Sequence, residues 1–378
     1  MDVAQPSFLF YIAAFIAVLS VLVFIHEMGH YLMGRAFNVK VDSFSIGFGK
    51  ELIGWTDKHD TRWKLSAIPL GGYVKFYGDA SAASNPDADI DSISPEERAV
   101  TLHYKPLYQR ALVVVAGPAI NFLFAILIYA ALFVMYGQPY TPAVVTAVLE
   151  DSPAAIAGIE PGDRIVALDG QSVDRFEDLL QMVHIRANQR VPVSIDRDGE
   201  VIGLTVQLAQ VEQVDRFGNR YLIGRLGING SQQAVAERGV FSALYHATLQ
   251  TGSLVRMMAR TIGEMILGKR SLDELGGPVK IAKLSGETAS LGILPLINLI
   301  ALISINLGFI NLLPIPMLDG GHLAFYAYEA IRGKPADAKA QELAFLAGLT
   351  MVLCLFVLLT VNDLNNLRVW DGLTRLFS

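Results

Sequence analysis

Four long stretches of this 378-residue chain contain no Asp, Glu, Lys, Arg or His. They cover residues 3–25, 111–149, 288–318 and 343–362. A helix of about 20 apolar residues crosses the hydrocarbon core of a bilayer, so each stretch is long enough to span a membrane. The sequence therefore predicts a polytopic α-helical membrane protein with four transmembrane helices.

Composition excludes several other classes of protein. Hydrophobic residues make up 52% of the chain and the net charge is only −6, which excludes intrinsic disorder. The single cysteine, Cys354, excludes a disulfide framework, and the lack of a dense basic cluster argues against a nucleic-acid partner. The first apolar stretch lacks a basic flank and a cleavage site before His26, so we expect a retained span rather than a signal peptide.

The apolar stretches divide the chain into segments. Lys and Arg gather between spans one and two and between spans three and four, which places both connections on the cytoplasmic side. Residues 81–97 within the first connection are small and acidic, and we expect a mobile loop there. The expected segments are transmembrane helix 1 (1–34), a cytoplasmic-side β-rich loop region (35–106), transmembrane helix 2 (107–136), an inserted α+β domain (141–209), strands followed by an amphipathic helix along the membrane (210–293), a broken transmembrane helix 3 (294–333), transmembrane helix 4 (341–362) and a tail (363–378).

The first span ends in His26-Glu27-Met28-Gly29-His30. Positions i and i+4 share one face of a helix, so both imidazoles can reach one Zn²⁺ at about 2.0–2.1 Å. Glu27 is placed to take a proton from a water that the metal activates. The alternative is a pair of histidines that cap or pack at the end of the span. Ionisable groups at membrane depth are costly unless they are functional, which favours the metal site.

The third span carries the best candidate for a third ligand. Pro314 and Pro316 prevent a regular helix there, and non-helical backbone at membrane depth survives only inside protein or beside a wet cavity. Asp319 follows directly, and we expect it to complete the site. Two alternatives stay open: Asp319 caps the helix that restarts at Gly320, or His322 is the ligand.

Residues 141–209 combine strand-like runs with one helical stretch. The segment 151–170, Asp-Ser-Pro-Ala-Ala-Ile-Ala-Gly-Ile-Glu-Pro-Gly-Asp-Arg-Ile-Val-Ala-Leu-Asp-Gly, resembles a PDZ domain of the type found in bacterial proteases. Any small αβ domain is the alternative. PDZ domains bind extended peptides by strand addition.

Three motifs together resemble the site-2 protease family of intramembrane zinc metalloproteases, in its bacterial regulator-of-sigma-E branch. They are His26-Glu-x-x-His30, Asn311-x-x-Pro-x-Pro-x-Leu-Asp319-Gly and the single PDZ-like insert. The segment 116–121, Ala-Gly-Pro-Ala-Ile-Asn, matches that branch as well. The resemblance implies one catalytic Zn²⁺ on His26, His30 and Asp319, with Glu27 as general base.

The resemblance also implies a function. It predicts a zinc metalloendopeptidase (EC 3.4.24.-) of the bacterial inner membrane that cuts single-span membrane proteins within or near their spans. An anti-sigma factor, after a first external cut, and remnant signal peptides are the implied substrates. The active site would lie toward the cytoplasm. The PDZ domain would be periplasmic and would meet peptide C-termini or remnants of substrate ectodomains.

Glycine-rich strands in the first connection are expected to hold the unwound substrate, because glycine in a strand marks the close approach of another backbone. By the same resemblance, the loop 46–49 lies beside the active site and in contact with membrane lipid. Asn311 either hydrogen-bonds the substrate or satisfies the carbonyls that Pro314 frees. The expected substrate-binding residues are Gly47, Phe48, Gly49, Gly71, Gly72, Tyr73, Asn311, Pro314 and Pro316.

Two other functions remain as alternatives. A metal-coupled transporter with a broken helix is one, and the lack of an internal repeat argues against it. A PDZ-bearing membrane scaffold without catalysis is the other, and the intact Glu27 with both histidines argues against that.

Overall fold

The structure is a computed structural model that describes residues 7–79, 94–214, 220–230, 234–268 and 276–366. The chain divides into two compact units. The membrane unit comprises residues 1–130 and 244–378, and the inserted unit comprises residues 131–243. Each unit is described by itself.

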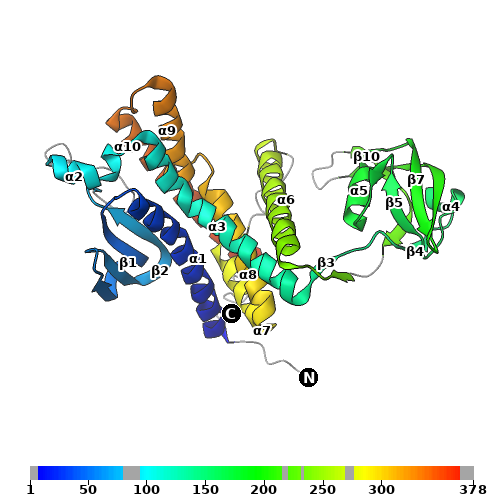
Figure 1. Ribbon diagram of the computed structural model, residues 1–378, viewed down its shortest axis with the longest axis horizontal. Helices are drawn as coiled ribbons and strands as arrows, with labels where there is room; N and C mark the ends of the chain where they lie inside the picture. Colours follow the sequence, from blue (N-terminus) through cyan, green and yellow to red (C-terminus); the bar gives the residue numbers. More distant parts are fainter. Residues whose placement is uncertain (1–6, 80–93, 215–219, 231–233, 269–275, 367–378) are drawn as a thin grey trace, which may run out of the picture. The chain divides into compact units, whose positions relative to one another are not determined.

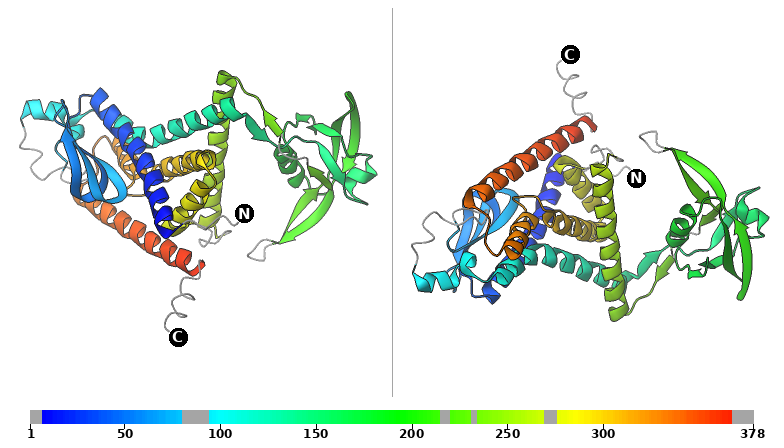
Figure 2. Two further views of the ribbon diagram at one scale, coloured as in Figure 1. Left: turned by 90° about the horizontal axis from the view of Figure 1, so that it is seen from below. Right: turned by 90° about the horizontal axis from the view of Figure 1, so that it is seen from above.

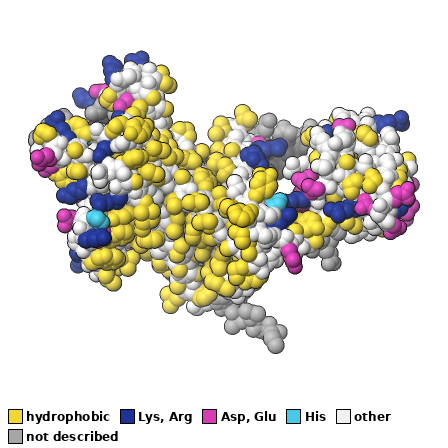
Figure 3. All heavy atoms as spheres, viewed as in Figure 1, with side chains coloured by type: hydrophobic (Ala, Val, Ile, Leu, Met, Phe, Trp, Pro, Cys, Tyr) yellow, Lys and Arg dark blue, Asp and Glu magenta, His cyan; other side chains and the backbone are white. Residues whose placement is uncertain are grey.

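Four helices are long and apolar enough to cross a membrane: α1 (Phe8–Ala36), α3 (Leu107–Tyr136), α8 (Ile293–Asn311) and α10 (Ala338–Asn366). Many of their Leu, Ile, Val and Phe side chains are exposed, and Figure 3 shows a largely hydrophobic surface on the face of the membrane unit toward the viewer. Such a surface suits lipid and not water. The chain is a multi-pass membrane protein.

The third apolar stretch is broken where the sequence predicts it. α8 ends at Asn311, and a new helix, α9 (Asp319–Arg332), begins after the two prolines. Gly333, in the left-handed conformation with φ 73°, ends α9. The turn between α8 and α9 therefore delivers Asp319 to the start of a helix.

Small residues let the membrane helices approach closely. A Cβ on Gly29 of α1 would collide with the Ala116 carbonyl of α3. A Cβ on Gly308 of α8 would lie 3.0 Å from the Pro118 carbonyl of α3. Because lipid supplies no hydrophobic drive for helix association, such close contacts carry the packing. They bring α1 and α8 against the middle of α3 (Figure 1).

The β-rich region between α1 and α3 is one long antiparallel hairpin, β1 (Val41–Thr56) and β2 (Arg62–Phe76), which packs on α1. Its core stacks Phe44 on Trp63, with ring centroids 4.5 Å apart. Farther out, Leu52, Ile53 and Trp55 are exposed. The hairpin therefore has one end anchored on α1 and one apolar end without cover from the described residues.

The expected loop at 81–97 falls partly outside the described residues, which resume at Ser94. From Pro95 to Val100 the chain forms the helix α2, followed by the short 3₁₀ helix η2 (Leu102–Tyr104). The loop assignment is wrong for residues 95–97. The physical reason is a capping box, in which the Ser94 and Glu97 side chains bind each other's backbone N–H groups.

Two further helices precede α8 along the chain. The expected amphipathic helix is α6 (Val240–Ile266), whereas α7 (Pro278–Ser290) was not foreseen. α7 packs against α1, where Gly286 meets the Tyr11 ring, and against α10. The buried Asp363 of α10 accepts hydrogen bonds from the backbone N–H groups of Gly277 and Lys280, which caps α7. Figure 2 shows these helices from two further sides.

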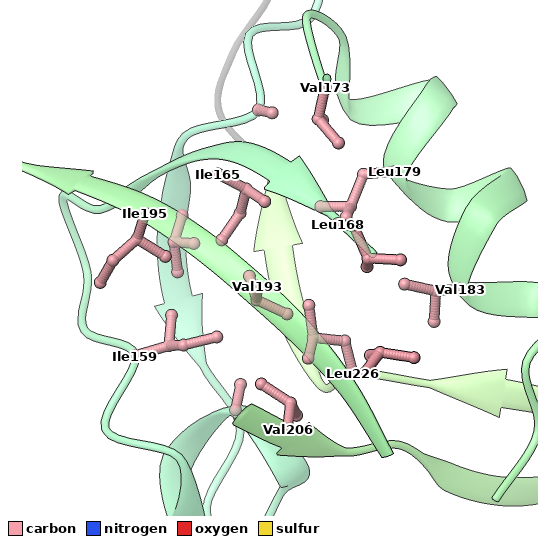
Figure 4. Close-up of a cluster of buried hydrophobic side chains, with 14 of the residues drawn as sticks. Ile159, Ile165, Leu168, Val173, Leu179, Val183, Val193, Ile195, Val206 and Leu226 are labelled. Atoms are coloured by element: carbon pink, nitrogen blue, oxygen red, sulfur yellow. The ribbon is translucent and has the colours of Figure 1, made fainter. Parts of the chain in front are cut away.

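The inserted unit has a four-stranded antiparallel sheet in the order β6-β5-β7-β8. Its strands fold around one apolar cluster that includes Ile165, Leu168, Leu179 and Ile195 (Figure 4). β11 pairs with β4, so the domain continues past residue 209. The elements are β3 (Gln138–Tyr140), β4 (Val145–Val148), α4 (Pro153–Ile156), β5 (Arg164–Leu168), β6 (Gln171–Ser172), α5 (Phe176–His184), β7 (Arg190–Arg197), β8 (Glu200–Gln207), β9 (Ala209–Val214), β10 (Arg220–Arg225), β11 (Ile228–Gly230) and β12 (Ala234–Ala236).

Candidate active site

Three side chains of the membrane unit meet at one point. His26 and His30 lie one turn apart on α1, and Asp319 is the first residue of α9. The two Nε2 atoms are 3.3 Å apart. Asp319 Oδ2 lies 3.2 Å from His26 Nε2, and Asp319 Oδ1 lies 3.5 Å from His30 Nε2. Among the described residues, this is the group of His, Cys, Asp and Glu with ligand atoms close enough to hold one metal ion.

The spacing of these atoms fits zinc. In a regular tetrahedron with metal–ligand bonds of about 2.0–2.1 Å, neighbouring ligand atoms lie about 3.3–3.4 Å apart. The observed separations of 3.2, 3.3 and 3.5 Å bracket that value. In addition, Asp319 Oδ2 is buried and accepts no hydrogen bond from the described residues, as expected for an oxygen reserved for a cation. Two imidazoles, one carboxylate and a free fourth position make the donor set of a hydrolytic zinc site.

The structure argues against both alternatives to Asp319 as third ligand, which were a capping role for Asp319 and a ligand role for His322. Leu318 precedes α9, and no side chain of the described residues caps the helix. The carboxylate of Asp319 faces the two histidines instead of the helix N–H groups. The His322 ring packs on Phe345, with centroids 4.9 Å apart, and it is outside the ligand cluster. Asp319 is therefore the residue that the fold brings to both histidines.

Two groups on α3 contact the imidazoles at Nδ1, on the side of each ring away from the ligand cluster. His30 Nδ1 lies 2.9 Å from the backbone carbonyl of Val113, and His26 Nδ1 lies 3.0 Å from the side-chain amide of Asn121. Such contacts fix the orientation of metal-binding rings. Asn121 belongs to the segment 116–121, which resembles the family, but the sequence alone indicates no role for it. A polar side chain in the middle of an apolar span was the available signal.

Glu27 lies between the histidines in sequence and beneath β2 in space. A Cβ on Gly72 would lie 3.4 Å from Glu27 Cγ and 2.6 Å from a methyl group of Val23. The strand passes so close to α1 that glycine is required, and it holds Glu27 beside the two ligands of the same helix.

The expected substrate-binding residues fall into three groups. Gly72 and its neighbours lie on β2 over Glu27, and Gly71 takes φ 95°, a conformation that favours glycine. Gly47 and Gly49 take φ 87° and 86° on β1, and between them Phe48 stacks on Tyr73 with centroids 6.0 Å apart. The two strands thus bring both glycine motifs into one hairpin that reaches the site through Gly72.

The third group comes from the broken helix. Asn311 Nδ2 lies 3.4 Å from His26 Nε2, so its amide faces the ligand cluster. Pro314 and Pro316 instead line an apolar cavity of about 460 Å³ with Phe325 and Tyr328. The structure thus places the Asn311 amide beside the candidate metal ligands, whereas the two prolines line a separate cavity.

Comparison with known proteins decides the family. The model of peptidase family M50 matches residues 14–355, which include every ligand candidate. The chain belongs to peptidase family M50. It is 49% identical to "Putative zinc metalloprotease Atu1380" of Agrobacterium fabrum, over 94% of this chain and 96% of that protein. It is 38% identical to metalloprotease MmpA of Caulobacter vibrioides, over 98% of this chain and all of that protein.

Part of this M50 chain also aligns with a solved structure. The match is the crystal structure of the PDZ domain of an SdrC-like protein from Listeria innocua, at 24% identity, a TM-score of 0.20 and coverage of 25% of this chain and 98% of that one. These matches confirm the family that the His26–His30 and Asn311–Asp319 motifs predict.

Proposed function

We propose that this M50 protein is a site-2-type zinc endopeptidase that hydrolyses a peptide bond within or near the transmembrane segment of single-span membrane proteins. The observation that carries the proposal is the convergence of His26, His30 and Asp319 at the end of an apolar helix, with Glu27 held beside them. A water-dependent reaction at this depth needs a protein-lined polar pocket, because lipid offers no water.

Zinc bound by these three residues would polarise the scissile carbonyl and activate a water at neutral pH. Glu27 takes the proton from that water and later passes it to the leaving amine. Asn311, whose amide faces the ligands, donates a hydrogen bond to the substrate carbonyl. The edge of the β1–β2 hairpin at Gly72 pairs with the unwound substrate as an added strand.

The inserted unit offers a second place for a peptide. A groove of about 330 Å³ runs between α5 and the strands β10 and β11. Its walls are largely apolar and include Leu149, Phe176, Leu180 and Ile223. We assign this groove to the C-termini or ectodomain remnants of substrates, in the manner of a PDZ domain.

The Lys and Arg distribution supports a location in the bacterial inner membrane, with the metal site toward the cytoplasm and the PDZ domain in the periplasm. The substrates in this proposal are an anti-sigma factor or a similar regulator after a first external cut, together with remnant signal peptides.

Glu27→Gln tests the proposal. The full-length protein and a single-span substrate that lacks its external domain are placed together in lipid vesicles, and the products are mapped by mass spectrometry. The wild type should cut within or next to the span. Glu27→Gln should keep its zinc and lose about 10²–10⁴-fold in rate, because the proton acceptor is gone.

Glu287→Gln is the matched control, since it makes the same chemical change on the exposed face of α7. It should cut at the wild-type rate. Undiminished cleavage by Glu27→Gln, or wild-type cleavage only in exposed loops, would contradict the proposal.

A further inference from the structure

Asn121 is fully buried in the middle of α3 and touches a metal-ligand candidate. Its Nδ2 lies 3.0 Å from Nδ1 of His26. Its Oδ1 is also buried and has no hydrogen-bond partner among the described residues. A buried amide oxygen without a hydrogen-bond donor costs free energy and calls for a physical explanation.

The tautomer of His26 decides which atom of the Asn121 amide should face its Nδ1. If the Asn121 amide donated to Nδ1, the proton of the neutral ring would lie on Nε2, the atom that faces Asp319 and His30. Nε2 would then have no lone pair for a metal. The oxygen and nitrogen of an amide are nearly indistinguishable by shape, so a half-turn about the Cβ–Cγ axis exchanges them without moving any other atom.

His30 shows the arrangement that a zinc site needs. Its Nδ1 lies 2.9 Å from the Val113 carbonyl, which can only accept a hydrogen bond. Nδ1 of His30 therefore carries the proton, and Nε2 presents its lone pair to the site. The same geometry at His26 requires an acceptor at the position of the Asn121 amide.

We propose that Asn121 is a positioning residue whose Oδ1 accepts the Nδ1–H of His26 and so fixes the ring as an Nε2 ligand. The inference rests on the proposed zinc site and adds the group that orients one of its ligands.

The surroundings hold the Asn121 backbone firmly enough for this task. Its carbonyl accepts a hydrogen bond of 2.8 Å from Ser304 of α8. A Cβ on Gly308 would lie 3.3 Å from Asn121 Cβ, so α8 closes directly on this turn of α3. With the backbone held from α8 and the amide on His26, Asn121 links the broken third span to the first ligand.

Two substitutions of near-equal size separate the possible roles. Asn121→Asp keeps only acceptors at the position, whereas Asn121→Leu keeps the shape and removes all polar atoms. Zinc affinity of the full-length protein in detergent is measured by competition with a chelator. Loss of an outer-shell partner of a metal ligand typically weakens metal binding about 10–100-fold. Asn121→Leu should show that loss, and Asn121→Asp should bind zinc as the wild type does or more tightly.

Thr251→Val is the control, because it also removes a buried polar atom from the membrane unit, on α6 away from the ligands. It should leave zinc affinity unchanged. If Asn121→Asp loses zinc while the wild type binds it, the amide nitrogen is the working atom and the inference fails. Wild-type zinc affinity in Asn121→Leu overturns it as well.

The Asp variant decides the question even if the Leu variant does not fold. The same measurements also distinguish a failure of this inference from a failure of the proposed function. A wild-type protein that binds no zinc refutes the metal site itself, whereas a zinc-loaded, active wild type with unaffected Asn121 variants refutes only the role of Asn121.

Discussion

The inserted unit and the membrane unit differ in the kinds of side chain that they bury. The inserted unit buries a continuous cluster of Val, Ile and Leu between its sheet and α5, as expected where water drives apolar side chains inward. The helices of the membrane unit expose such residues, and their buried positions include polar side chains. These are His26, Asn121, Thr251, Ser285, Ser304 and Asp363.

The difference shows where function can be built. A polar group buried between lipid-facing helices must find partners inside the protein, because neither water nor lipid satisfies it. Pairs such as His30 with Val113 and Asn121 with Ser304 therefore both hold helices together and shape the metal site. In the inserted unit, the groove proposed for peptides lies at the surface.

The largest effect is expected at the third ligand. Asp319→Asn should reduce zinc affinity by more than the 10–100-fold typical of an outer-shell change, because it removes the charged ligand itself. Cleavage should fall in parallel. Metal analysis of the purified protein and the vesicle assay measure both, with Glu342→Gln on the exposed start of α10 as control. Normal zinc content in Asp319→Asn would transfer the role to another residue.

Gly117→Ala tests whether close helix packing sets the site. A Cβ there would collide with the His30 ring, with Cδ2 only 2.9 Å away, and the ring is already held by Val113. We expect weaker zinc binding and slower cleavage. Gly263→Ala in α6 meets nothing within 4 Å and should leave both unchanged, with a gain of about 0.5–1 kcal/mol from helix propensity. Equal zinc binding and equal cleavage rates in the two variants would show that close helix packing at Gly117 does not set the site.

Leu179→Ala tests the inserted unit alone. Leu179 is 1% exposed in the apolar cluster, and truncation of such a residue costs about 2–5 kcal/mol. Hydrogen exchange followed by mass spectrometry should show lost protection in peptides from residues 143–208. Zinc content should stay at the wild-type level. A drop in zinc would show that the metal site depends on this core.

The smallest effect concerns Asp163. A hydrogen bond from Arg197 lowers the pKa of this buried carboxyl below its ordinary value of about 3.9. A depressed pKa in the folded state contributes stability above about pH 4 and loses it as the pH falls through the folded-state value. Asp163→Asn should therefore destabilise the inserted unit at neutral pH, and the difference from wild type should shrink in acid. Urea-dependent proteolysis of the full chain at each pH measures it; a constant difference would contradict the assignment.

Much of this architecture was readable from short patterns. Apolar length predicted the four spans, Pro314 and Pro316 predicted the break, and the i, i+4 spacing predicted that His26 and His30 share a face. The helix α7 escaped prediction because its polar sequence resembles that of a connection, and its place depends on Tyr11 and Asp363, which are far away in the chain.

The sequence by itself determined the types of the candidate ligands, the spacing of two of them on α1 and the membrane spans, because helix period and apolar length are local properties. Only the tertiary structure decided between the two uses of Asp319, directed Asn311 to the ligands and placed Asn121 behind His26. These contacts join residues up to 293 positions apart along the chain, counting from His26 to Asp319. Helix packing, which no local pattern encodes, brings them together.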